Sequence, residues 1–402
     1  MESNLNKMEQ IKLEIQKLKE YNKKYKTDFK LSDTRISFYC LNKGNQLFEI
    51  LNSFTFPKLE NLDLRCNQLK EIDLLPLVHL EKLKILNISE NELENIDPIG
   101  KCNLENLNEL LLFKNKLISI DILSKCNFKD LKILNISENA INSINVGIFN
   151  NFPLLENLNL SENNLKSNEI FTNENVFNNL KILYLSRNQI KNLTYFNCPK
   201  LIELYLIGNG INSIESFEKS NLSELKILWI SENQIQNIDF FAQCKWNNLT
   251  ELYLSNNLIN NIDILSKCDF NKLETLYLSE NQIDRIDIFS EINLKFLKTL
   301  NLNNNKIKEI DIFAKCTFEN LINLHLNNNQ IKAIDSLLCS PLGKELQILN
   351  LRFNQIDNMQ VISQNKFDNM KILDIKNNKI DKKKNKELIA DIKKNNNYKL
   401  LV

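Results

Sequence analysis

The sequence is poor in glycine, proline and histidine, with 6, 6 and 2 copies among its 402 residues. With only His79 and His325, and no C-x-x-C pair among 9 cysteines, the usual zinc sites are excluded. The scarcity of glycine excludes Gly-rich phosphate loops and the Gly-rich, carboxylate-rich repeats that bind calcium. We therefore expect no metal and no cofactor.

An excess of charge of one sign is also lacking, because 51 Lys and Arg against 50 Asp and Glu give a net charge of +1. This balance gives no indication of an overall polyanion-binding or membrane-surface character. No apolar run reaches the roughly 18 residues that span a bilayer, and the N-terminal MESNLNKMEQIK lacks the apolar core of a secretory signal. We expect a soluble protein of the cytoplasm or nucleus with no membrane partner.

Most of the cysteines recur at one repeat position, 24 residues apart for Cys102 and Cys126 and again for Cys244 and Cys268. Such recurrence is typical of a small buried apolar side chain, so we expect no disulfide. A redox role for stacked neighbours such as Cys244 and Cys268 is the alternative. Three N-x-S sequons on the face expected to bind partners favour a reducing compartment, since a secreted chain would risk glycosylation there. These sequons begin at Asn87, Asn135 and Asn159.

What the chain does contain is an internal repeat, L-x-x-L-x-[LI]-x-x-N-x-[LI]. In residues 225–248 its fixed positions are held by Leu225, Leu228, Ile230, Asn233 and Ile235. The asparagine recurs fourteen times, mostly at steps of 24 residues, at Asn67, Asn91, Asn115, Asn139, Asn163, Asn188, Asn209, Asn233, Asn257, Asn281, Asn305, Asn329, Asn354 and Asn378. This regularity predicts a stack of equivalent coils rather than separate globular domains.

The pattern resembles the leucine-rich-repeat family over residues 59–380, with residues 33–58 as a degenerate first repeat. The resemblance implies an α/β fold: a right-handed solenoid, horseshoe or arc. A parallel β-sheet would line its concave face and short helical or 3₁₀ segments its convex face. The short convex segment and the I-x-x-I after the asparagine resemble the cytosolic subclass that includes the regulatory subunit of protein phosphatase 1.

Position within the repeat also assigns roles. Alternation along a strand turns Leu228 and Ile230 inward and Trp229 outward. The asparagine, such as Asn233, is predicted to bond turn amides and carbonyls that would otherwise be buried unpaired. A recurrent aspartate before the convex segment is expected to be its N-cap, with calcium binding as the alternative that the glycine shortage disfavours. These aspartates are Asp73, Asp97, Asp121, Asp239, Asp263, Asp287, Asp311 and Asp335.

Both ends of the chain are predicted to be caps that cover the open ends of the stack. Residues 1–32 form an amphipathic helical pattern, with a partner-binding helix or short coiled coil as the alternative. Its apolar positions are Met8, Ile11, Ile15, Leu18 and Tyr25. Residues 381–402 are lysine-rich, with Leu388, Ile389 and Ile392 as an apolar side. Nucleic-acid contact through these lysines is the sharper alternative, but no nucleic-acid motif accompanies them, so nucleic acid is not expected as a partner.

The outward position is aromatic in five consecutive strands, at Tyr184, Tyr205, Trp229, Tyr253 and Tyr277. At about 4.8 Å between strands, these rings would form a stripe of roughly 20 Å. Carboxylates flank the stripe at Glu203, Glu232, Glu251 and Glu280. Tyr and Trp are enriched among binding hot spots, and carboxylates favour a basic partner, which the rings could also hold by cation–π contacts. The alternative is that tyrosines suit half-exposed strands and stabilise the sheet by stacking.

We therefore predict a non-enzymatic scaffold or adaptor that binds a partner protein with a basic surface on its concave face. The nine aromatic and acidic residues above would be the partner-binding site. His325 shares its stripe with Asn301 and Asn350 and has no nucleophile or orienting carboxylate there, so no catalysis is expected. The alternatives are a structural component of a cytoskeletal, ciliary or other large assembly, or a phosphatase-type regulatory subunit. The oligomeric state and the partner's identity do not follow from the sequence.

Overall fold

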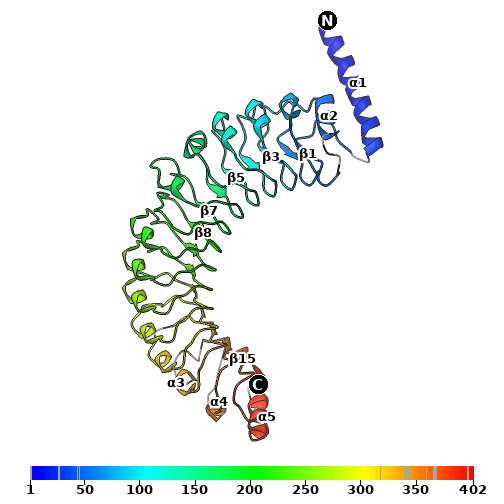
Figure 1. Ribbon diagram of the computed structural model, residues 1–402. Coiled ribbons are helices and arrows are strands. Elements are labelled where there is room, and N and C mark those ends of the chain that lie inside the picture. The colour runs from blue at the N-terminus through cyan, green and yellow to red at the C-terminus, as the bar shows by residue number, and fades with distance from the viewer. Residues whose placement is uncertain are drawn as a thin grey trace. The chain divides into compact units, whose positions relative to one another are not determined.

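The computed structural model describes residues 2–25, 28–42, 44, 46–316, 318–338, 342, 345–358, 360–364, 369–395 and 398–402. The chain divides into two compact units, the first made of Met1–Lys166 and Asn173–Tyr184 and the second of Ser167–Thr172 and Leu185–Val402. In both units a three-residue strand, a turn and a short helical segment alternate along the chain (Figure 1).

The first unit contains parallel strands that pair in chain order. They are β1 (Arg35–Ser37), β2 (Asn61–Asp63), β3 (Ile85–Asn87), β4 (Glu109–Leu111), β5 (Ile133–Asn135), β6 (Asn157–Asn159) and β7 (Ile182–Tyr184). Its α-helices are α1 (Glu2–Tyr25) and α2 (Gln46–Ser53), and its 3₁₀ helices are η1 (Leu75–Leu77), η2 (Asp97–Lys101), η3 (Asp121–Lys125) and η4 (Val146–Asn151).

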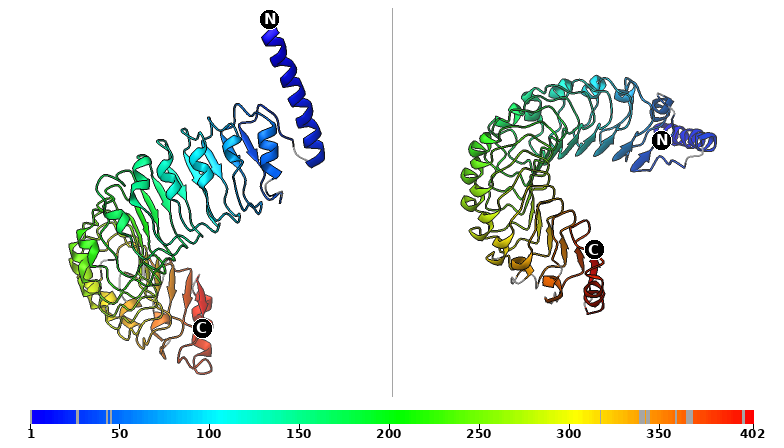
Figure 2. Two further views of the ribbon diagram at one scale, coloured as in Figure 1. Left: turned by 45° about the horizontal axis from the view of Figure 1, so that its top comes forward. Right: turned by 60° about the horizontal axis from the view of Figure 1, so that its bottom comes forward.

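The second unit follows the same plan, with parallel pairing in chain order. Its strands are β8 (Glu203–Tyr205), β9 (Ile227–Trp229), β10 (Glu251–Tyr253), β11 (Thr275–Tyr277), β12 (Thr299–Asn301), β13 (Asn323–His325), β14 (Ile348–Asn350), β15 (Ile372–Asp374) and β16 (Lys399–Leu401). Its helical segments are η5 (Glu169–Thr172), η6 (Glu215–Lys219), η7 (Asp239–Gln243), η8 (Asp263–Lys267), η9 (Asp287–Ser290), η10 (Asp311–Ala314), α3 (Asp335–Leu338), α4 (Gln360–Gln364) and α5 (Lys386–Asn395). Within this unit the strands lie on the concave side and the helical segments on the convex side (Figures 1 and 2).

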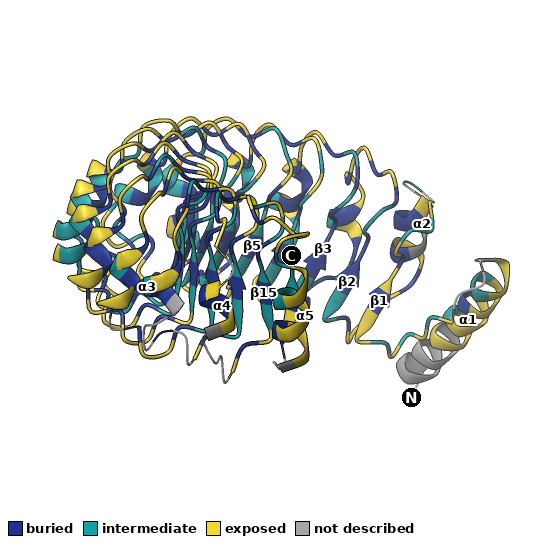
Figure 3. Ribbon diagram, turned by 90° about the horizontal axis from the view of Figure 1, so that it is seen from below, coloured by how far each residue is buried: buried dark blue, intermediate teal, exposed yellow. Residues whose placement is uncertain are grey.

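The fixed apolar positions of the repeat form the core. Leu225, Leu228, Ile230 and Ile235 are fully buried between the sheet and the helical segments, and strands such as β3, β5 and β15 are coloured as buried or half-buried in Figure 3. Aromatic rings fill the convex half, as where Phe241 packs against Trp246 with ring centroids 4.9 Å apart. The predicted fold class, an α/β leucine-rich-repeat solenoid with a parallel sheet and short helical segments, is confirmed.

The structural role predicted for the repeated asparagine is also confirmed. The Nδ2 group of Asn233 donates to the carbonyl oxygens of Leu206, Ile230 and Ser231 at 2.9–3.0 Å. Its Oδ1 atom accepts from the backbone N–H groups of Asn209 and Ile211, both at 3.0 Å. One buried side chain therefore joins two consecutive repeats through five hydrogen bonds to main-chain groups of their turns.

The predicted N-capping role of the aspartates is wrong for the helical segments whose caps are described. In η2, η3 and η7–η10 the N-cap residue is the isoleucine before the aspartate, and it makes no side-chain cap hydrogen bond. The aspartate is the first helical residue, so its own N–H needs an acceptor. In η7 and η8 the residue two positions earlier supplies it: Asn237 Oδ1 accepts from the N–H of Asp239 at 2.6 Å, and Asn261 Oδ1 from that of Asp263 at 2.7 Å.

At the N-terminus, α1 packs against the repeats through Leu18 and Tyr21 in its second half. Leu18 is buried and Tyr21 makes an edge-on contact with Phe54, whereas Ile11 and Ile15 are 51% and 41% exposed. The side chains of Met8 and Tyr25 lie outside the described residues. At the C-terminus, the segment predicted to be a basic cap contains α5 and also β16, a strand that the sequence analysis does not predict. The capping function of either end stays a prediction.

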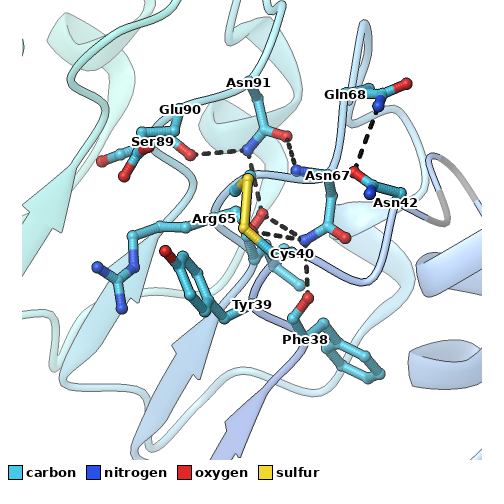
Figure 4. The surroundings of a disulfide bond; sticks show 12 residues. Phe38, Tyr39, Cys40, Asn42, Arg65, Asn67, Gln68, Ser89, Glu90 and Asn91 are labelled. Carbon is cyan, nitrogen blue, oxygen red and sulfur yellow. Dashed lines mark hydrogen bonds between the residues drawn. A yellow bond between two sulfur atoms is a disulfide. The ribbon is translucent and has the colours of Figure 1, made fainter.

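The expectation that the chain has no disulfide is wrong. Cys40 and Cys66 are joined, with their Cα atoms 4.6 Å apart and 26 positions between them in the sequence (Figure 4). Both lie in the turns that follow β1 and β2, next to Arg65, whose guanidinium lies 4.9 Å from the centre of the Tyr39 ring. The recurrent cysteines behave differently: Cys102, Cys244, Cys268 and Cys316 are half-buried free thiols that donate to backbone carbonyls four residues earlier.

Within the described residues, none of the helices has both the length and the apolar character that crossing a bilayer requires.

Candidate partner-binding site

The structure brings four of the five predicted aromatic residues together. Tyr205, Trp229, Tyr253 and Tyr277 each end a strand, and strand pairing sets them side by side across β8 to β11. All four are half-buried on the concave face of the second unit. Tyr184 ends β7 and belongs to the first unit. We call the four rings of the second unit the aromatic row.

Neighbouring rings of the aromatic row contact one another. Trp229 and Tyr253 are stacked, with ring centroids 4.3 Å apart and an interplanar angle of 18°. Tyr253 and Tyr277 are 5.0 Å apart and tilted by 38°, and Tyr205 and Trp229 are 6.2 Å apart and tilted by 39°. Stacking covers the ring faces that Trp229 and Tyr253 turn toward each other, so a cation cannot reach them. The edges of the rings and the adjacent carboxylates remain accessible for binding.

Two of the predicted carboxylates hold the tyrosines in place. Tyr205 donates its hydroxyl to Glu203 Oε2 at 2.9 Å, and Tyr253 donates to Glu251 Oε2 at 2.7 Å. Burial, together with the bond to Glu251 and the charge of that carboxylate, raises the pKa of Tyr253 well above its usual value. The hydroxyl of Tyr253 therefore stays protonated. The two half-buried carboxylates orient the tyrosine rings and also add negative charge beside the aromatic row.

The other two predicted carboxylates project freely. Glu232 and Glu280 each occupy the first turn position after a serine, with left-handed φ angles of 58° and 55°, and both are exposed. Asn256 holds the equivalent position in the repeat between them, with φ 53°. Two carboxylates thus stand two repeats apart, roughly 10 Å at the usual strand spacing.

The rings and the two free carboxylates border a hollow of about 510 Å³. Its lining consists of Trp229, Ser231, Glu232, Tyr253, Ser255, Asn256, Tyr277 and Glu280. Three aromatic side chains form one wall of this hollow, and five polar residues, two of them carboxylates, make up the rest. The serines and Asn256 are not among the residues predicted from the sequence, although their fixed distance from each strand was a sufficient pointer. The two carboxylates of the hollow would attract a cationic side chain of a bound segment, and would repel an anionic one.

Nothing in the described part of the chain points to a metal site, since no group of three or more His, Cys, Asp and Glu side chains converges there. His325 ends β13 between Asn301 and Asn350, as predicted. Burial lowers the pKa of His325 below its usual value, so the ring is neutral at physiological pH.

Comparison with known proteins supports the fold. Sequence models of the leucine-rich repeat match residues 57–117 and, in overlapping pairs of repeats, residues 199–339. Together these matches cover half of the chain. No curated protein matches it.

Solved structures give the same result. A leucine-rich-repeat protein of Leptospira interrogans is similar with a TM-score of 0.74 and 24% identity, over 92% of this chain and 96% of that chain. An internalin of Listeria monocytogenes has a TM-score of 0.55 and 24% identity, over 78% and 79%. The Drosophila Toll–Spatzle complex contains a similar chain with a TM-score of 0.65 and 23% identity, over 83% and 45%. At these identities the likeness shows the fold alone. By its repeats and its fold, the chain belongs to the leucine-rich-repeat family.

Proposed function

We propose that the protein is a non-enzymatic interaction scaffold that binds a partner protein on the concave face of its second unit. The aromatic row would supply contact area, and Glu232 and Glu280 would pair with basic side chains of the partner. The observation that carries the proposal is the 510 Å³ hollow, where an aromatic wall and two free carboxylates meet.

Several features support this proposal. Leucine-rich-repeat proteins generally act as interaction modules, and the similar Toll chain was solved in complex with Spatzle. Large rigid rings such as Trp229 give binding energy at a small entropic cost. The stack alone would also stabilise the sheet, by about 0.5–1.5 kcal/mol for each ring pair. The experiment must therefore separate binding from stability.

The test is a double variant, Trp229→Ala with Tyr253→Ala, used as bait in the full-length chain against cell lysate. Retained proteins are identified by mass spectrometry, and the affinity of a purified partner is then measured. If both rings are hot spots, each should contribute at least about 2 kcal/mol, roughly a thirtyfold loss of affinity. Circular dichroism and urea unfolding check that the variant is folded at the assay temperature.

A matched control is Tyr195→Ala with Phe353→Ala, which removes two aromatic side chains that are exposed elsewhere in the second unit. This control should retain every partner. A third variant, Glu232→Gln with Glu280→Gln, should slow association and reduce its dependence on salt. If the wild type and the Trp229/Tyr253 variant retain the same lysate proteins equally well, the proposal is wrong.

A further inference from the structure

The turn after each strand contains a backbone N–H that points to the concave face, and in seven repeats the side chain that ends the strand accepts from it. After β4 and β7 the equivalent N–H groups of Phe113 and Ser186 have no acceptor among the hydrogen bonds of the described residues. Where the strand ends in Asn or Asp, the side-chain oxygen accepts from the N–H two residues later, as from Asn135 to Ser137 at 3.0 Å. The same bond joins Asp63 to Arg65, Asn87 to Ser89, Asn159 to Ser161, Asn301 to Asn303, Asn350 to Arg352 and Asp374 to Lys376. The oxygens of these Asn and Asp side chains therefore bond to the backbone of their own repeat, and that N–H is not available to a partner.

The repeats at the two borders of this region borrow an acceptor from the preceding repeat. Ile207, which follows Tyr205, donates its N–H to Ser186 Oγ at 3.2 Å. Asn327, which follows His325, donates its N–H to Asn303 Oδ1 at 3.0 Å.

The three repeats in between have no such arrangement. Ser231, Ser255 and Ser279 follow Trp229, Tyr253 and Tyr277, whose side chains have no acceptor within reach of these groups. Among the hydrogen bonds of the described residues, none has the N–H of these three serines as its donor. The flanking N–H groups do bond between repeats, as Ile230 does to Tyr253 O and Glu232 to Ser255 O. At the equivalent position of other repeats, the side-chain oxygens of Asn135 and Asn159 reach this N–H from the concave face, so the N–H groups of the three serines are open to the same face.

These three N–H groups, which we call the donor ledge, lie two residues past the ends of the paired strands β9, β10 and β11 and span roughly 10 Å at the usual strand spacing. Ser231 and Ser279 are only 6% and 8% exposed, so water reaches their N–H groups only through the hollow. An unpaired buried donor is unfavourable, and an acceptor placed over the ledge is therefore stabilised. The hydroxyls are partly engaged already, because Ser279 Oγ donates to Ser255 Oγ at 2.8 Å.

The charge of the hollow selects among acceptors. A carboxylate or phosphate over the ledge would lie beside Glu232 and Glu280 and be repelled. A neutral carbonyl oxygen meets no such repulsion. A peptide segment with basic side chains supplies both neutral carbonyl oxygens for the N–H groups and cations for the carboxylates. We propose that the donor ledge binds main-chain carbonyl oxygens of an extended partner segment whose basic side chains pair with Glu232 and Glu280. This inference rests on the proposed function and adds how the partner's backbone is held.

Two substitutions at one position isolate the ledge from the rings. Both Tyr253→Asn and Tyr253→Leu remove the ring, and both residue types occur at this repeat position elsewhere in the chain, as Asn135 and Leu111. Only asparagine would supply a local acceptor for the N–H of Ser255, as Asn135 does for Ser137. Any difference between the two variants therefore reports on that N–H group.

The experiment uses the full-length chain, labelled with ¹⁵N, and the peptide Ac-(Lys-Ala)₄-NH₂ as the probe. In the free protein the amides of Ser231, Ser255 and Ser279 should exchange with solvent at least about tenfold faster than those of Ser137 and Ser161, which are bonded. The peptide should shift and slow all three ledge amides together with the indole resonance of Trp229. Tyr253→Asn should slow exchange at Ser255 without peptide and bind the peptide about three- to tenfold more weakly than Tyr253→Leu, the effect of one net hydrogen bond.

The outcomes separate the two proposals. A peptide that shifts the Trp229 indole but leaves the exchange of all three ledge amides unchanged overturns the ledge and leaves the aromatic row as the site. Equal peptide affinity for Tyr253→Asn and Tyr253→Leu also overturns it. A wild-type protein in which millimolar peptide moves neither the indole nor the amides contradicts both the ledge and the basic partner.

Discussion

The Oδ1 atom of Asn233 accepts a hydrogen bond from the backbone N–H of Ile211 at 3.0 Å, across the boundary between two consecutive repeats. The same geometry recurs along the second unit, for example from Asn257 to Ile235 and from Asn281 to Ile259. Each repeat is therefore held to its neighbour by a buried amide as well as by strand pairing and apolar packing. A repeat protein whose coils contact only their neighbours depends strongly on such junctions.

Replacing this amide should be costly. Asn233→Ala would remove five hydrogen bonds, including those that the N–H groups of Asn209 and Ile211 donate to Oδ1. The three carbonyl oxygens would each keep a second donor. We expect the free energy of unfolding to fall by at least about 2 kcal/mol, measured by urea denaturation. The control is Gln236→Ala, an exposed position in the same repeat, which should change it by less than about 0.5 kcal/mol. Equal effects of the two substitutions would show that the amide is dispensable.

The features that could be predicted from the sequence are those that repeat. The spacing of Leu228, Ile230 and Asn233 is enough to assign a buried face, and alternation then places Trp229 outward beside Tyr253. The stripe prediction followed from these two steps. The stacking of the two rings did not, because ring orientation depends on side-chain torsions that the pattern leaves open.

Features that depend on where turns meet in space could not be predicted. Cys40 lies in the degenerate first repeat and Cys66 in the repeat after it, both away from the position at which the other cysteines recur, so their pairing had no periodic signature. The open N–H group of Ser255 follows from the direction of one backbone bond. The N-cap prediction for the aspartates was wrong by a single residue. The sequence pattern does not distinguish the N-cap from the first helical residue beside it, yet only an N-cap side chain accepts the capping hydrogen bond.

That corrected cap geometry can be tested. Because Asn237 Oδ1 accepts from the N–H of Asp239, Asn237→Ala should lower the free energy of unfolding by about 0.5–1 kcal/mol. Asp239→Ala keeps that N–H and its acceptor, so its effect should be smaller. Urea denaturation of the two single variants gives the order, and the pair Asn261→Ala and Asp263→Ala repeats the comparison one coil later. A larger loss for the aspartate variants would restore the original capping prediction.

The disulfide leads to a prediction about redox conditions. Closing a loop between residues 26 positions apart restricts the unfolded chain and typically stabilises a protein by about 2–4 kcal/mol. Dithiothreitol should therefore lower the urea midpoint of the first unit. Cys40→Ser with Cys66→Ser should show the same lower midpoint with or without reductant. A peptide map of the unreduced protein should contain the linked Cys40 and Cys66 peptides, and finding both thiols alkylated would contradict the assignment.

Alkylation of intact cells before lysis extends this test to the protein's compartment. Disulfides persist in oxidising surroundings, whereas the cytosol keeps most thiols reduced. A linked Cys40–Cys66 peptide recovered from such cells would oppose the cytoplasmic location expected from the sequence. Recovery of two alkylated thiols would agree with that location and would show the bond to be absent in the cell.

Half-buried His325 makes the free energy of unfolding depend on pH, and the lowered pKa of its ring fixes the direction of that dependence. Burial lowers its pKa in the folded chain below the ordinary 6.5, so between these two pKa values the unfolded chain binds more protons than the folded one. The free energy of unfolding contributed by this residue should therefore rise as pH increases through that window and level off above about 6.5. A ¹H NMR titration of the His325 ring should give a pKa below 6.5, and urea midpoints at several pH values should rise less steeply for His325→Gln than for the wild type. A titration midpoint at or above 6.5 would contradict the burial argument.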